Sequence, residues 1–108
     1  MGTHVVPVEM VGVDPGAEPR TFRYVRTIQQ GRYLRSGEPG GLVVGRAIAE
    51  RLSADLDDQI VATAVGPGGG IENAMFRLVG IVTTGSEDGD AAVCQVVLAD
   101  LEKLTGLS

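Results

Sequence analysis

The glycine-rich segment GPGGGI, residues 66–71, is where residue types and spacing first suggest chemistry, because glycine runs can cradle a phosphate group. Ile71 stands where the dinucleotide-binding fingerprint has its last glycine, and the segment lacks the Gly-Lys-Ser/Thr of a P-loop. A strand is predicted to follow it, so no helix N-terminus would hold a bound phosphate. We therefore interpret the segment as the tip of a β-hairpin and predict no nucleotide-binding residue.

Side chains that could supply a nucleophile or a base are sparse. His4 is the only histidine and lies near a terminus, where disorder is common. Ser86 follows Gly85, but Thr84 replaces the first glycine of the Gly-x-Ser-x-Gly nucleophile elbow. Cys94 is the only cysteine, so it has no internal disulfide partner, and it is predicted to be a small buried residue on a strand. The sequence thus predicts no catalytic residue and no enzyme.

Two acidic clusters, Asp57–Asp58 and the EDGD segment at 87–90, are the remaining candidates for chemistry. EDGD supplies too few ligands at too short a spacing for a calcium loop. Both clusters fall at predicted turns, where carboxylates stay solvated. The net charge of −5 disfavours a phosphate backbone as a partner. We therefore predict no metal site, no cofactor and no nucleic-acid partner.

The elements that would position these residues form one α+β domain over residues 1–108. Apolar residues at helical spacing, such as Phe22, Val25 and Ile28, indicate short helices, and alternating or continuous apolar runs indicate strands. Gly31 and Gly106 follow two of the helices as their expected left-handed ends. Strands are expected at 5–13, 42–44, 59–66, 74–84 and 91–98, helices at 21–30, 46–53 and 99–106, and a turn at 85–90. One core is expected from Ile48, Leu52, Ile60, Phe76, Leu78, Val96, Leu101 and Leu104.

Several short motifs follow one another in a specific order: VGVDP, QGRYL, GLVVGRAIAERL, DDQIVATAV, FRLVGIVTTG and VVLADLEKLTGL. In this order they resemble the extracytoplasmic core domain of ABC-transporter permeases. The group resembled is the lipoprotein-releasing LolC/LolE and FtsX-like permeases, whose domain is related to that of the macrolide exporter MacB. The resemblance covers about residues 8 to 107. Asp57 stands where this family usually has a glycine, and because aspartate tolerates a positive φ better than most residues, the turn is expected to survive.

The resemblance implies a non-catalytic domain on the outer, periplasmic face of the cell membrane, as part of an integral membrane protein. There it would lie between the first transmembrane helix of a permease and the remaining three. ATP hydrolysis by a separate cytoplasmic subunit would move the helices and this domain with them, and lipoprotein cargo or an envelope protein would be its partner. The implied fold is a small, mostly antiparallel sheet or barrel-like domain with two or three short helices, similar to the subdomain called Sabre.

The chain has no run of about 18 apolar residues, so it is expected to be a fragment that does not itself span the membrane. An alternative interpretation is a small double-psi-barrel-like enzyme or ligand-binding domain, because strand–helix–turn–strand units also occur there. Hydrophobic segments on both sides of this region in the parent reading frame would distinguish the two.

The hairpin tip is the candidate partner contact. A hairpin can reverse direction with two residues, whereas GPGGGIENA is long and carries the apolar Ile71. Binding residues concentrate on loops held by a rigid scaffold, so the tip could meet cargo or an envelope partner. Alternatively, Ile71 folds back on the sheet and the tip is an ordinary loop. The candidate residues are Gly68, Gly69, Gly70, Ile71, Glu72 and Asn73.

Overall fold

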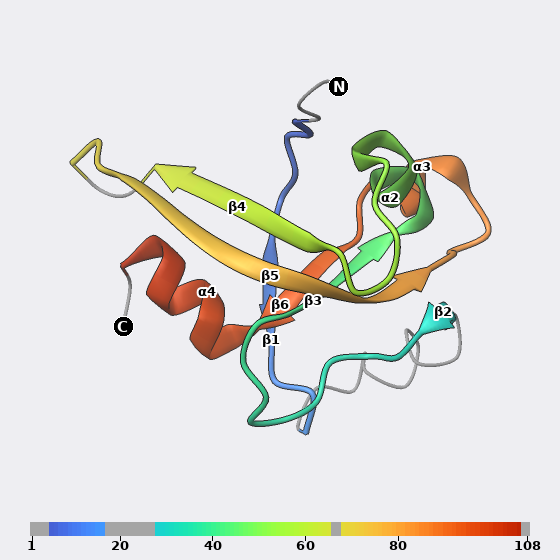
Figure 1. Ribbon diagram of the computed structural model, residues 1–108, viewed down its shortest axis with the longest axis horizontal. Helices are drawn as coiled ribbons and strands as arrows, with labels where there is room; N and C mark the ends of the chain where they lie inside the picture. The colour runs from blue at the N-terminus through green and yellow to red at the C-terminus, as the bar shows by residue number, and fades with distance from the viewer. Residues whose placement is uncertain (1–4, 17–27, 66–67, 107–108) are drawn as a thin grey trace.

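One long strand, β5 (Ile71–Val82), lies at the centre of the computed structural model, which describes residues 5–16, 28–65 and 68–106 (Figure 1). Its C-terminal half pairs in parallel with β3 (Gly41–Gly45) on one side and antiparallel with β2 (Ile28–Gly31) on the other. Its N-terminal half pairs antiparallel with β4 (Gln59–Val65). Beyond β3 come β6 (Cys94–Val97), which is antiparallel to it, and β1 (Val11–Val13), which is parallel to β6.

The resulting six-stranded sheet is mixed and open. Within the described ranges β1 pairs only with β6, and β2 and β4 pair only with β5, so the sheet has free edges and does not close. The prediction of an α+β domain with two or three short helices is confirmed, since α2, α3 and α4 are present in the described ranges. The sheet is mostly antiparallel, as predicted, because three of its five strand pairings are antiparallel. It is open, so the barrel-like alternative of that prediction does not hold.

Two helices lie where apolar spacing predicts them. They are α2 (Arg46–Leu52) and α4 (Leu98–Thr105). Gly106 ends α4 with φ of 74°, which confirms the expected left-handed cap. A third helix, α3 (Glu87–Asp90), replaces the turn expected at 85–90. The hydroxyl of Ser86 caps it by accepting a hydrogen bond from the Gly89 N–H at 3.0 Å, and acidic side chains favour the first turn of a helix.

The N-terminal elements differ most from expectation. Ile28–Gly31 is strand β2, where a helix was expected to reach residue 30; the rest of that helix, 21–27, lies outside the described residues. Gly31 has φ of 76°, but it lies at the end of strand β2 and caps no helix. Glycine is needed there because a Cβ would lie 2.1 Å from the Val79 carbonyl oxygen. The glycine lets β2 approach β5, and this sheet pairing outweighs the local helical spacing. The strand expected at 5–13 is reduced to β1.

Apolar side chains gather in two clusters, one on each face of the sheet. Because side chains alternate between the two faces along β3, Leu42 and Val44 lie in the cluster that α2 and α4 cover, and Val43 lies in the other cluster. All eight predicted core residues belong to the first cluster, which confirms the prediction. Ile48, Phe76, Leu78, Val96 and Leu104 are buried there, and Leu52, Ile60 and Leu101 pack against it with part of their surface exposed.

Candidate functional site

The β4–β5 hairpin forms an arm that extends beyond the rest of the sheet, with α4 alongside it (Figure 1). The arm begins at the turn before β4, where Asp57 has φ of 70° and its N–H donates to the Leu78 carbonyl at 2.8 Å. The expectation that Asp57 tolerates a positive φ in this turn is therefore confirmed. Seven residue pairs in unbroken register, from Gln59 with Arg77 to Val65 with Ile71, then hold the arm straight.

The inner face of the arm completes the core. Strand alternation directs Ile60, Ala62 and Ala64 of β4 to this face, together with Ala74 and Phe76 of β5. Phe76 is buried, and the other four are partly buried against the same cluster as Leu104 of α4. Packing on α4 therefore fixes the arm as a rigid part of the domain.

The outer face of the arm, by contrast, is apolar and exposed. Two cross-strand pairs, Val61 with Met75 and Val65 with Ile71, form it. Val61 is 58% exposed and Met75 59%, and Val65 is 72% exposed and Ile71 67%. Between the two pairs, the Thr63 hydroxyl donates to the Asn73 side-chain oxygen at 2.7 Å. Exposed apolar side chains gathered on one face mark an interaction site more often than scattered ones do.

The candidate residues predicted from the sequence divide between the tip and the strand. Gly68, Gly69 and Gly70 are exposed, and nothing lies within 4 Å of a Cβ added to any of them. Positive φ values of 89° and 87° at Gly68 and Gly69 explain the choice of glycine at those two positions. Ile71, Glu72 and Asn73 already belong to β5, so the connection is shorter than expected.

Ile71 does not fold back on the sheet, since it is paired with Val65 and mostly exposed. Sequence reasoning found Ile71 but missed its neighbours Val61, Val65 and Met75 on the same face. The sequence did contain a signal for this outer face. β4 carries apolar side chains at both sets of alternate positions, and one of the two sets must face away from the core.

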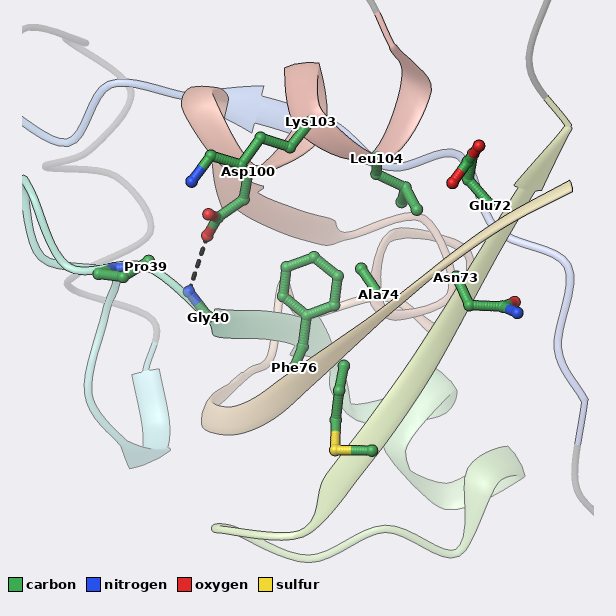
Figure 2. A pocket seen from close by; sticks show the side chains of 10 residues that line it. Pro39, Gly40, Glu72, Asn73, Ala74, Phe76, Asp100, Lys103 and Leu104 are labelled. Carbon is green, nitrogen blue, oxygen red and sulfur yellow. Dashed lines mark hydrogen bonds between the residues drawn. The ribbon is translucent and has the colours of Figure 1, made fainter. Parts of the chain in front are cut away.

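A groove lies beside the inner face of the arm. Figure 2 shows it between Pro39 and Gly40, residues 72–76 of β5, and α4, which contributes Asp100, Lys103 and Leu104. Its volume is about 300 Å³. The Asp100 carboxylate accepts a hydrogen bond from the Gly40 N–H at 2.8 Å, which joins the start of β3 to α4 and closes one end of the groove.

The reactive groups considered from the sequence take part in core packing or in turns, where the structure describes them. Cys94 is buried as predicted, and burial raises the pKa of its thiol to about 11, so the unreactive protonated form prevails near neutral pH. Asp58 in its turn accepts from the Asp55 N–H at 2.8 Å. No group of three or more acidic, histidine or cysteine side chains within the described ranges could hold a metal ion. His4 lies outside those ranges.

Asp90, in the second acidic cluster, is also structural. Its carboxylate accepts hydrogen bonds from the Thr84 N–H at 2.6 Å and from the hydroxyls of Thr84 and Thr83. The backbone bond from Thr84 is the main reason that the pKa of Asp90 is lowered. This carboxylate ties α3 to the end of β5.

Comparison with family models and with curated proteins identifies no relative: no protein-family model matches the chain, and a search of curated proteins returns no match. Among the described residues, no helix is long and apolar enough to cross a membrane.

Proposed function

We propose that this chain is a non-catalytic extracytoplasmic domain of an ABC-transporter permease, of the lipoprotein-releasing or FtsX-like kind. In this role it couples the ATP-driven motion of transmembrane helices to the handling of cargo or a partner outside the membrane, with lipoprotein release or export as the expected process. Its partners are the transmembrane helices and cytoplasmic ATPase of the full permease, and a lipoprotein or envelope protein.

The observation that carries the proposal is the arm, with one face fixed on α4 and the other face apolar and exposed. A domain that transmits motion to a partner needs a rigid contact surface, and the arm provides one. The order of the motifs from VGVDP to VVLADLEKLTGL supports the family assignment. Against the alternative, a double-psi-barrel-like enzyme or ligand-binding domain, stands the open sheet.

An antibody raised against this chain tests the proposal in the source cells. We expect it to detect a protein much larger than 11.2 kDa in the membrane fraction, which co-purifies with an ATPase after detergent extraction. Detection of an 11.2 kDa protein in the soluble fraction, without an ATPase, would contradict the proposal.

Replacing Ile71 with aspartate in the parent protein tests the arm. Ile71 is 67% exposed, so the substitution should change the free energy of unfolding of the domain by less than about 0.5 kcal/mol. It places a charge on the apolar outer face, and we expect the variant to complement a strain lacking the parent gene poorly. Ala92→Asp introduces the same charge at another exposed site and serves as the matched control. Full complementation by Ile71→Asp at normal expression would show that the outer face of the arm makes no functional contact.

A further inference from the structure

The N-terminal part of β5 has a strand on one side only. β3 begins to pair with β5 at Gly41, opposite Arg77, and its neighbour Gly40 accepts a hydrogen bond from the Arg77 N–H at 2.8 Å. Residues 71–76 extend past this point, and within the described ranges they pair only with β4. This bare edge of β5 lies along the groove beside α4.

The register tells which backbone groups line the bare edge. The Leu78 N–H donates to the Asp58 carbonyl at 3.0 Å, so Leu78 turns its backbone groups toward β4, whereas Arg77 turns its N–H toward Gly40. Backbone direction alternates along a strand, and Asn73 and Met75 therefore direct their N–H and C=O groups away from β4. The side-chain hydrogen bond from Thr63 to Asn73 agrees, because side chains approach most closely in pairs that exchange no backbone bonds.

This edge lacks several of the features that usually prevent strand addition, although it carries one charged residue, Glu72. Proteins protect free edges with proline, lysine, bulges or a covering segment. Residues 71–76 are IENAMF, with no proline or lysine, and their pairing with β4 has no bulge. Two N–H and two C=O groups, those of Asn73 and Met75, are thus directed into a groove where no strand of the described ranges receives them.

The walls of the groove restrict what could be added there. Phe76, Ala74 and Leu104 provide an apolar floor beneath α4. Two carboxylates line the groove, those of Asp100, which is engaged by Gly40, and Glu72. Lys103 is the basic residue of the lining, and it forms no ion pair with any described residue. The groove therefore favours an extended backbone with apolar side chains on its inner face and an acidic side chain opposite Lys103.

We propose that the groove binds an extended peptide segment of a partner protein, which adds to β5 as a further strand. Backbone hydrogen bonds to Asn73 and Met75 hold the segment, apolar side chains lie over Phe76 and Leu104, and an acidic residue pairs with Lys103. The site is distinct from the outer face of the arm, and the inference does not depend on the chain belonging to a permease.

Amide hydrogen exchange tests the geometry of the free edge. In the chain alone, the N–H groups of Glu72, Ala74 and Phe76 should exchange slowly because they are bonded to β4, whereas those of Asn73 and Met75 should exchange at least about tenfold faster. Peptide binding should slow Asn73 and Met75 selectively. Equal protection of all five amides in the free chain would contradict the proposed edge.

Selection from a phage library of random linear dodecapeptides provides the probe for binding. We expect enrichment of peptides with alternating apolar residues and an acidic residue. Met75→Pro removes one N–H from the bare edge and leaves the β4 pairing intact, so it should weaken the selected peptide at least about tenfold. Met75→Ala, which keeps the N–H, is the matched control and should bind within about twofold of the wild type.

Two further measurements keep the result decisive if Met75→Pro unfolds. The selected peptide can be methylated at either of its two sets of alternate backbone nitrogens, and methylation of only one set should abolish binding. Lys103→Glu should weaken binding of the unmethylated peptide. Failure to enrich any peptide, or equal binding by both Met75 variants in folded form, would overturn the proposal. A concentration-dependent dimer in sedimentation that competes with the peptide would also overturn it, since a second copy would then occupy the edge.

Discussion

Replacing Gly45 with alanine is expected to destabilise the chain by about 3 kcal/mol or more, which chemical denaturation would measure. A Cβ at this position would lie 1.9 Å from the Asp90 carbonyl oxygen and 2.6 Å from its carbonyl carbon. Both are backbone atoms of α3, and hydrogen bonds from Thr83 and Thr84 to the Asp90 carboxylate hold that helix in place. No flexible side chain can move aside, so β3 and α3 must separate.

Gly70→Ala is the control for this prediction. Gly70 has no atom within 4 Å of its added Cβ and no positive φ, so the change should alter the free energy of unfolding by less than about 0.5 kcal/mol. A Gly45→Ala variant as stable as Gly70→Ala would show that β3 and α3 are not packed as described.

Truncation of Leu78 to alanine should cost about 4 kcal/mol, because the side chain is 1% exposed and its removal leaves a cavity in the core. Leu78 lies where β5 meets both β3 and the turn before β4, so neighbouring backbone has little freedom to collapse into the space. Leu98→Ala, at a leucine 45% exposed on α4, should cost less than about 1 kcal/mol. Similar denaturation midpoints for the two variants would contradict the assigned core.

The segment from β3 to β4 could be predicted from the sequence because its signals are local. Leu42, Val43 and Val44 form a continuous apolar run that suits a strand buried on both faces. Strong helix formers follow, and aspartate then supplies the positive φ at Asp57. Each of these residues determines its own backbone state with little help from distant parts of the chain.

The regions that were predicted wrongly depend on distant partners. Ile28 has helical spacing with residues before it, yet its backbone pairs with Val82 of β5. Nothing near Gly31 in the sequence reveals that Val79 will come too close for a side chain. The miss at α3 has a different cause: this single turn of helix is stabilised by the Ser86 cap and by the hydrogen bonds of Asp90, and one short turn is a weak signal in the sequence.

The candidate site was predicted only in part, for the same reason. The unusual length of the hairpin connection and the apolar Ile71 drew attention to the arm. The outer face required the cross-strand register, because Met75 joins it only by pairing with Val61. The bare edge of β5 required still more, since it exists only because β3 begins at Gly41 and leaves the preceding part of the edge unpaired.

Thiol labelling of the arm tests the proposed extracytoplasmic location most directly. In the parent protein, Gly70→Cys places a thiol at the exposed tip. Cys94 is buried and the pKa of its thiol is raised to about 11, so it should not react with the label. The proposal predicts that a membrane-impermeant maleimide labels the Gly70→Cys protein in intact spheroplasts, above the level of the unsubstituted protein. Labelling that appears only after the spheroplasts are lysed would place the arm inside the cell and contradict the proposed function.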